Sequence, residues 1–226
     1  MPRSKRYQEI TKLIDKNKTY SPEEAIELVK KISTTHFDAS VEVHCRLGID
    51  TKKSDQQVRT VATLPHPIGK TKKIAAFVAD KDAKTAKEAG ADLVGSDDLI
   101  KEIKKSSKVN FDVAIATPEM MKNLAQIAKI LGPKGLMPSP KNETVTTNIA
   151  KTILEIKKGK INFKNDETGN IHQAIGKVSL ETKKLLENFE AFTAALRKAK
   201  PTSSKGIFLK NVVICSTMGP GIKVQV

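Results

Sequence analysis

Residues 74–95 read IAAFVADKDAKTAKEAGADLVG, and this stretch decides the fold of the middle of the chain. It opens with six consecutive apolar residues, 74–79, a pattern typical of a strand buried on both faces. A helix is predicted up to Glu88, because Gly90 stands where helices commonly end. Residues 93–95 form a second short apolar run. The stretch therefore predicts two parallel strands connected by a helix.

The same alternation continues toward residue 158. Residues 96–98 (Ser-Asp-Asp) are suited to begin a helix, and residues 111–116 form another apolar strand. Thr117-Pro118-Glu119 begins a helix predicted to reach about Ile130, and a last helix is predicted over residues 147–158. Strands and helices that alternate at this length predict a Rossmann-like, three-layer α/β domain over residues 67–157.

The first outer segment has a different character. Ser21 and Glu24 form a capping box at the start of an amphipathic helix. Residues 41–49 then alternate between apolar and polar side chains, which predicts a strand with one buried and one polar face. A second predicted strand, 58–64, runs into Pro65-His66-Pro67-Ile68-Gly69, whose prolines and glycine mark a hinge or a domain boundary.

The last segment returns to this mixed pattern. Residues 161–164 and 171–178 are predicted strands, and the turn-forming residues 165–170 between them predict a hairpin loop. Ser179 is predicted to cap a long helix, and residues 206–215 form the last substantial strand. Together the outer segments predict a discontinuous α+β domain, residues 1–66 and 158–226, with the α/β domain inserted into it. The sequence permits this organisation but does not require it.

The chain carries 40 Lys and Arg against 25 Asp and Glu, a net charge of +15. Residues 1–65 and 156–226 together hold 25 basic and 14 acidic groups, which assigns most of the net charge to the outer segments. A field of this size attracts polyanions, and nucleic acid is the most abundant candidate. The chain has no Trp and few, dispersed Phe and Tyr residues, so it lacks an aromatic platform for stacking bases. We therefore expect contacts with the backbone and shape of folded RNA, or with the backbone of DNA.

The sequence gives no sign of catalysis, of a metal site or of a cofactor. Gly69-Lys70-Thr71 imitates the end of a phosphate-binding P-loop, but Leu64 replaces its first glycine and a strand follows it. Cys45 and Cys215 stand alone, and the histidines show no ligand spacing (His36, His44, His66 and His172). The longest apolar run is too short to span a bilayer, and no apolar segment follows the basic N-terminus. A cytoplasmic protein without an enzymatic role or a membrane contact is expected.

Residues 130–140 read ILGPKGLMPSP. By themselves, their glycines and prolines predict only a rigid, basic loop on the middle domain. The string resembles the signature loop of the ribosomal protein L1 family, and further matches run from end to end of the chain. These are Phe37-Asp38, Val41-Glu42-Val43-His44, Leu47-Gly48-Ile49-Asp50, Leu64-Pro65-His66, Glu88-Ala89-Gly90-Ala91-Asp92, Asn165-Asp166, Thr168-Gly169, Ile171-His172 and Thr217-Met218-Gly219-Pro220.

The resemblance implies a structural constituent of the large ribosomal subunit. Its outer domain would bind ribosomal RNA of the mobile stalk near the exit site, and its second domain would swing as deacylated tRNA leaves. It also implies repression of the protein's own operon, through binding of the operon's mRNA by the same surface. The expected partners are thus large-subunit ribosomal RNA, exit-site tRNA and this mRNA, with a monomer off the ribosome. The ribosome is expected to be cytoplasmic, and an organellar ribosome is left open.

The resemblance further implies which residues contact RNA. They are Phe37, Ser40, Glu42 and Arg46 in the first segment, and Lys164, Asp166, Thr168, His172, Thr217, Met218 and Gly219 in the last. Arg46 and Lys164 suit phosphates, whereas Ser40 and Thr217 suit ribose hydroxyls. Gly219 would permit a close approach of the backbone. Glu42 would accept a hydrogen bond from a base or ribose; the alternative is an ion pair with Arg46 on the same face.

The chain departs from the family pattern at a few positions. Pro67 stands where a glycine is usual, which is expected to stiffen the hinge, and Ser139 replaces a usual asparagine. His36 and Glu167 stand where lysine is frequent, which weakens phosphate contacts there. Two other classes of protein remain as alternatives. A DNA-binding, chromatin-like protein would be indifferent to RNA fold and 2′-OH groups, and a nucleotide-dependent enzyme would bind a free nucleotide.

Overall fold

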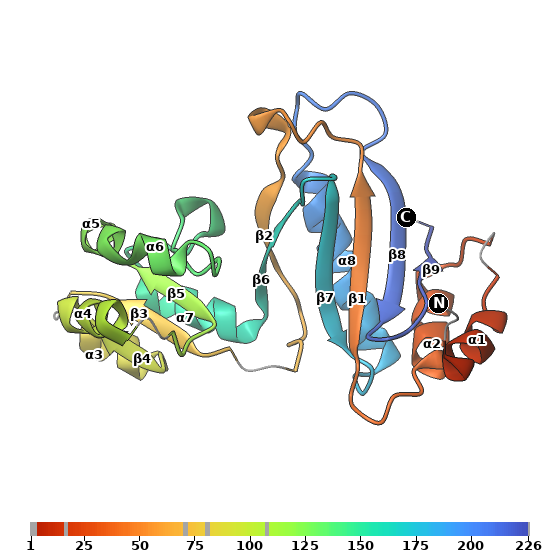
Figure 1. Cartoon of the computed structure of the whole chain (residues 1–226), viewed down its shortest axis with the longest axis horizontal. Coiled ribbons are helices and arrows are strands. Elements are labelled where there is room, and N and C mark those ends of the chain that lie inside the picture. The colour runs from red at the N-terminus through yellow and green to blue at the C-terminus, as the bar shows by residue number, and fades with distance from the viewer. Residues whose placement is uncertain (1–3, 16–17, 70–71, 80–81, 107–108, 226) are drawn as a thin grey trace. The chain divides into compact units, whose positions relative to one another are not determined.

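The structure is a computed structural model that describes residues 4–15, 18–69, 72–79, 82–106 and 109–225. The chain divides into two compact units (Figure 1). The outer unit is Met1–Gly69 with Ile161–Val226, and the inserted unit is Lys70–Lys160. Lys70 and Thr71 of the P-loop-like string lie outside the described residues. No helix among the described residues is long and apolar enough to cross a membrane.

In its described residues, the outer unit contains a four-stranded antiparallel sheet, a two-stranded sheet and three α-helices. Its elements are α1 (Lys5–Lys12), α2 (Pro22–Ile32), β1 (Ser40–Leu47), β2 (Arg59–Thr63), β6 (Lys160–Lys164), β7 (Asn170–Lys177), α8 (Thr182–Lys198), β8 (Leu209–Ser216) and β9 (Ile222–Lys223). The sheet has the order β7-β1-β8-β9, so strands from both outer segments interleave. The discontinuous α+β part of the predicted fold class is confirmed.

The predicted alternation of β1 determines how the sheet is covered. Val41, Val43, Cys45 and Leu47 are buried. They belong to one core with the apolar faces of α2 and α8, and α8 crosses behind β7 and β1 in Figure 1. The predicted capping box is present, because Ser21 and Glu24 exchange hydrogen bonds between side chain and backbone at the start of α2. The intervening residues of β1 therefore point to the face opposite the helices.

The predicted hairpin across residues 161–178 is wrong. β6 pairs with β2 in a separate two-stranded sheet, whereas β7 pairs with β1. Asn165 explains the difference, since its N–H donates to the Val58 carbonyl at 3.1 Å and its side-chain oxygen accepts the Val58 N–H at 2.8 Å. These bonds hold the chain beside residues 58–63, and the following turn then redirects it into the larger sheet.

Ser179 does not cap the long helix. α8 begins at Thr182, and its N-cap position is occupied by Glu181 without a side-chain hydrogen bond. The Ser179 hydroxyl instead donates to the Asp38 carboxylate at 2.9 Å, and its N–H donates to the other oxygen of that group at 3.2 Å. Ser179 thus fixes the loop before β1 to the loop before α8.

Asn188 is a fully buried polar residue within α8. Its side-chain amide donates to the Ile175 carbonyl at 2.8 Å and to the His66 carbonyl at 3.1 Å, and it accepts the His66 N–H at 3.0 Å. Two hydrogen bonds therefore attach the predicted hinge segment to α8 at His66, and the third ties the same amide to β7.

The inserted unit contains a three-stranded parallel sheet of order β4-β3-β5. Its elements are β3 (Ile74–Phe77), α3 (Ala83–Glu88), β4 (Leu93–Gly95), α4 (Asp97–Ser106), β5 (Val113–Ala116), α5 (Met121–Leu124), α6 (Ala128–Leu131) and α7 (Ile149–Lys158). Ile74 and Ala76 of β3 share a core with α3 and α7, whereas Ala75 and Phe77 share another with α4, α5 and α6. The predicted three-layer, Rossmann-like arrangement is confirmed.

The helix predicted from Thr117 to Ile130 is interrupted. A 3₁₀ turn, Ala125–Ile127, separates α5 from α6, and Thr117 closes a turn with Met120 without capping a helix. Met120, Leu124, Ile127 and Leu131 are nevertheless all buried. Their spacing keeps the predicted apolar face, so packing of this face is retained although the hydrogen-bond ladder changes.

Lys160, at the boundary of the inserted unit, has a buried ammonium group with two carboxylate partners. Its Nζ lies 2.6 Å from Glu143 and 2.8 Å from Glu155. Burial opposes the charged form, but the hydrogen bonds that Lys160 donates to both carboxylates outweigh it and raise the pKa of Lys160. The hydrogen bond with Lys160 also lowers the pKa of Glu155. The three charges join the end of α7 to the loop that precedes it.

Candidate nucleic-acid interface

The face of the outer sheet opposite the helices, here called the open face, carries polar side chains from three strands. They are Ser40, Glu42, His44 and Arg46 of β1, Asn170 and His172 of β7, and Asn211 and Cys215 of β8. Strand register brings them together, because His44 pairs with His172, Arg46 pairs with both Asn170 and Asn211, and Glu42 pairs with Cys215. Side chains of paired residues on one face lie in contact.

A bulge in the pairing of β1 with β7 places these residues. The register shifts between Val41 and Glu42, so Val41 pairs with Gly176 but Glu42 pairs with Ala174. The extra residue on β7 allows Ile175 and Gly176 both to be buried. It also turns Ala174, His172 and Asn170 toward the open face.

Ser40, Glu42 and Thr217 meet at one end of the open face. The Thr217 hydroxyl accepts the Ser40 N–H at 3.1 Å and lies 3.4 Å from the Glu42 carboxylate, to which it can donate. Lys177 donates to the Ser40 hydroxyl at 3.0 Å and to the Asp38 carbonyl at 3.2 Å. This end is therefore a hydrogen-bonded group of hydroxyls with one ammonium and one carboxylate.

The loop after β8 and the segment before β1 add exposed apolar side chains. Met218 has a left-handed backbone (φ 64°), and its side chain is 68% exposed. Arg6 of α1 donates to its carbonyl at 3.1 Å, and a Cβ at Gly219 would collide with the Ser216 hydroxyl. A left-handed non-glycine residue is unfavourable by about 1 kcal/mol or more, so this turn holds Met218 outward at a cost in strain. Phe37, before β1, is likewise exposed.

Asp166 organises the turn before β7. Its carboxylate accepts the N–H of Asn170 at 2.6 Å and of Thr168 at 3.0 Å, and the Thr168 hydroxyl at 2.8 Å. Partial burial opposes ionisation, but these bonds outweigh it and lower the pKa of Asp166 to about 2. Arg46 pairs with Asn170, next to this turn, and has no ion-pair partner among the described residues. Its guanidinium is exposed to solvent.

Lys164 lies apart from the open face. It is an exposed residue of β6, in the smaller sheet, two positions before the Asp166 turn. Of the predicted residues, Ser40, Glu42, Arg46 and His172 lie on the open face itself. The others lie in the loops next to it (Phe37, Asp166, Thr168, Thr217, Met218 and Gly219).

The proposed ion pair between Glu42 and Arg46 is not what the structure shows. Glu42 has other neighbours: the Thr217 hydroxyl at 3.4 Å and His44 Nε2 at 3.8 Å. Residues two apart on a strand lie further apart than cross-strand partners, which favours the contact across to the end of β8.

Sequence reasoning missed several residues of the open face. His44, Asn170, Asn211, Cys215 and Lys177 all contribute to it or bond to its members. The alternation of β1 already indicated that His44 shares a face with Glu42 and Arg46. The β8 residues carried no such signal, because only the pairing with β1 determines which of them meet the polar side chains of that strand.

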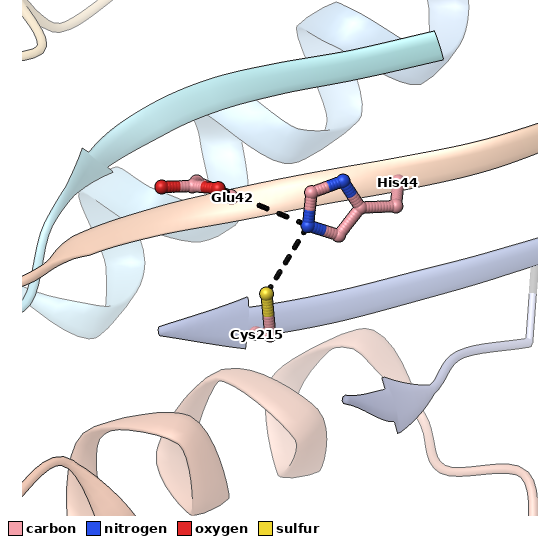
Figure 2. Close-up of side chains that lie close together, drawn as sticks. All are labelled: Glu42, His44 and Cys215. Carbon is pink, nitrogen blue, oxygen red and sulfur yellow. Dashed lines mark hydrogen bonds and ion pairs between the residues drawn. The ribbon is translucent and has the colours of Figure 1, made fainter. Parts of the chain in front are cut away.

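His44 is at the centre of a chain of contacts across the open face (Figure 2). Its Nδ1 lies 2.8 Å from His172 Nδ1, and its Nε2 lies 3.2 Å from the Cys215 sulfur. Burial and the neighbouring His172 lower the pKa of His44, although Glu42 opposes this shift. Burial and the Glu42 carboxylate raise the pKa of Cys215 to about 11. At neutral pH the imidazole and the thiol therefore both lack charge.

The positive charge is divided almost equally between the two units. The outer unit holds 22 basic and 14 acidic groups, and the inserted unit holds 18 and 11, so their net charges are +8 and +7. The sequence count grouped residues 156–226 with the outer segments, but Lys157, Lys158 and Lys160 belong to the inserted unit. These three lysines account for the excess of charge that was assigned to the outer segments. The open face itself combines Arg46 with Glu42 and uncharged polar groups. Hydrogen-bonding groups therefore distinguish this face more than charge does.

Comparison with known proteins relates this arrangement to a family. The sequence model of the Ribosomal protein L1p/L10e family matches residues 29–220, which include β1, β7, β8 and the loop of Thr217–Gly219. The chain belongs to this family. Two relatives named large ribosomal subunit protein uL1 come from Thermosipho melanesiensis, at 48% identity, and Thermosipho africanus, at 49%. Each alignment covers 226 residues, 100% of this chain and 97% of the relative.

These similarities confirm the predicted resemblance to the ribosomal protein L1 family over the whole chain. The family match includes every residue that the resemblance implied for RNA contact, from Phe37 to Gly219. It also includes the loop of residues 130–140, where Leu136 packs into the inserted unit's core and Lys134 is exposed.

Proposed function

We propose that this protein is a structural constituent of the large ribosomal subunit and binds ribosomal RNA through the open face and its adjoining loops. Membership of a ribosomal protein family is the observation that carries this proposal. The arrangement of the outer unit supports it, since residues from distant parts of the chain supply hydroxyls, a cation and exposed apolar side chains to one side of the sheet. A role without catalysis, on the cytoplasmic ribosome, is part of the proposal.

The chemistry of the two ends of the open face suggests separate tasks. Arg46, exposed and without an ion-pair partner among the described residues, would neutralise a phosphate, and Lys164 on β6 would do the same nearby. Ser40 and Thr217 would bond ribose hydroxyls, which distinguish RNA from DNA. Glu42 would accept a hydrogen bond from a base or ribose. The exposed Met218 and Phe37 would pack against the sugar or base surface.

The finer roles follow from the family resemblance. We propose that the outer domain, residues 1–66 and 158–226, anchors the protein on stalk RNA. The inserted domain, 67–157, would move about the hinge as deacylated exit-site tRNA leaves. The same face would bind the mRNA of the protein's own operon and repress it, and off the ribosome the protein would be a monomer. Equal expression of that operon with and without excess protein would disprove the repressor role.

Binding across a salt series tests the RNA proposal. The ligands are a folded stalk fragment of large-subunit ribosomal RNA, an unrelated RNA hairpin of equal length, and the matching DNA duplex. A preference for the stalk fragment that persists at higher salt supports specific recognition. Equal binding to all three that collapses with salt means that charge acts alone and contradicts the proposal.

Two pairs of variants locate the surface. Arg46→Gln should lower the salt slope by about one unit, whereas Arg197→Gln, an exposed arginine on the helical side, should leave it unchanged. Thr217→Val should weaken binding to the stalk fragment, and Thr217→Ser, which keeps the hydroxyl, should restore it. Normal binding by Thr217→Val and Arg46→Gln would mean that the surface lies elsewhere.

A further inference from the structure

Three side chains that metals commonly bind converge on the open face from two strands. Glu42 and Cys215 are direct cross-strand partners, and His44 lies two residues from Glu42 on the same side of β1. The ligand atoms of all three lie within 4.8 Å of one another. His44 is central, with its Nε2 at 3.2 Å from the Cys215 sulfur and 3.8 Å from the Glu42 carboxylate (Figure 2).

These separations are close to those of a tetrahedral zinc site. Zinc binds nitrogen and oxygen at about 2.0–2.1 Å and thiolate sulfur at about 2.3 Å, so tetrahedral angles separate neighbouring ligand atoms by about 3.4–3.6 Å. The two contacts of His44 fall on either side of this range, each within about 0.4 Å of it. Small side-chain rotations on a fixed sheet would therefore suffice to place an ion between the three ligands.

The contacts of His44 are compatible with the tautomer that binds metal. Its Nδ1 lies 2.8 Å from His172 Nδ1, so one of these two nitrogens must carry the proton. When His44 carries it, Nε2 is left with a lone pair that accepts the Cys215 thiol proton. His172 then carries its proton on Nε2, which lies 3.6 Å from the Asp166 carboxylate. A ligating histidine usually donates its second ring N–H to a partner in this way.

We propose that Glu42, His44 and Cys215 bind a zinc ion on the open face, with His172 as the positioning residue for His44. A thiolate, an imidazole and a carboxylate suit zinc, whereas calcium and magnesium prefer oxygen ligands alone. On binding, the zinc–sulfur bond replaces the S–H bond of Cys215, and the thiol proton passes to solvent. The three ligands are only partly buried, so the fourth position is open to water.

Cobalt(II) binding to the full-length protein tests the site without RNA. Thiolate-bound cobalt gives a charge-transfer absorption in the near ultraviolet, and zinc should displace it. Cys215→Ser should abolish this absorption. Cys45→Ala should keep it, because Cys45 points into the core on the other face of the same sheet. Far-ultraviolet circular dichroism checks that each variant is folded, and Glu42→Gln provides a second ligand variant that should weaken zinc binding but keep the absorption.

The histidines provide a matched pair. His172→Ala should lower zinc affinity about 10–100-fold while the thiolate absorption remains at saturating cobalt. His36→Ala, an exposed histidine before β1, should change neither. Absence of the thiolate absorption in the wild-type protein, or its persistence in Cys215→Ser, overturns the site. Equal zinc affinity in His172→Ala and His36→Ala overturns the positioning role.

Discussion

The buried amide of Asn188 allows a direct test of what holds the hinge segment to the outer unit. Asn188→Leu keeps the number and branching of the side-chain heavy atoms, so it should leave no cavity, but it removes three hydrogen bonds. The Ile175 carbonyl would be left buried without this partner, at a cost of about 1–3 kcal/mol. The two bonds to His66, which are only partly buried, should add about 0.5–1.5 kcal/mol each. We expect a total loss of about 2–6 kcal/mol in the free energy of unfolding of the outer unit.

Tyrosine fluorescence can measure this loss selectively. The chain has no Trp, and both of its tyrosines, Tyr7 and Tyr20, belong to the outer unit. Urea unfolding followed by tyrosine emission therefore reports on that unit, whereas circular dichroism reports on both. A loss in this range is a large fraction of the stability of a typical domain, so the unfolding midpoint should fall clearly.

Glu187→Gln is the matched control for this variant. It removes the contact of an exposed carboxylate with the His66 imidazole and leaves the Asn188 bonds in place. Exposed pairs of this kind contribute less than about 1 kcal/mol. A loss below about 1 kcal/mol for Asn188→Leu, or equal losses in the two variants, would refute the view that buried hydrogen bonds anchor His66.

Four further variants, at three sites, give distinct outcomes. Glu143→Gln combined with Glu155→Gln leaves the buried Lys160 ammonium without a carboxylate partner and should lower the free energy of unfolding by about 3–5 kcal/mol. Lys160→Met leaves only carboxylates that water can reach and should lower it by about 1 kcal/mol. Thermal melting followed by circular dichroism measures both. Gly48→Ala should destabilise the outer unit by about 1–3 kcal/mol in urea, because its Cβ would collide with a backbone carbonyl. The pKa of Asp166 is lowered to about 2 in the folded protein, compared with about 4 in the unfolded chain. The stability that its carboxylate contributes is therefore complete above pH 4 and is lost as the pH falls toward 2. The difference in the free energy of unfolding between the wild type and Asp166→Asn, measured in urea, should therefore decrease between pH 4 and pH 2.

Each of these predictions has a result that would contradict it. Equal melting losses in the lysine variant and the double glutamine variant would mean that burial of the ammonium is unimportant. A neutral Gly48→Ala would mean that the neighbouring backbone yields easily. A pH-independent difference between wild type and Asp166→Asn would mean that the carboxylate charge does not hold the turn.

Patterns within single elements were predictable from the sequence. The alternation of β1 and the continuous apolar run of β3 follow from which faces each strand buries, and this is a local property. The capping box of α2 is local as well. The predicted hairpin failed because turn chemistry fixes the turn but not the partners of the strands on either side. Those partners were determined by contacts of β6 with β2 and of β7 with β1.

The polar cluster on the open face depends on contacts that the sequence does not display. His44 and Cys215 are separated by 171 residues, and they meet only because β8 pairs with β1 in one particular register. The ligand spacings recognised in sequences are short ones within a single loop or helix, so isolated histidines and cysteines gave no signal. The assignment of RNA contacts to residues of this face stays a prediction from the family resemblance.

The interleaved outer sheet has a consequence for how the protein is made. β1 is synthesised early, but its neighbours β7 and β8 follow only after the inserted unit, with β8 roughly 160 residues later. Translation adds about 5–20 residues per second, so β1 is without its last partner strand for roughly 10–30 seconds. The inserted unit is contiguous and can complete its parallel sheet during that interval. Both edges of β1 and its apolar face remain open to chaperones or to other nascent chains until the C-terminus emerges.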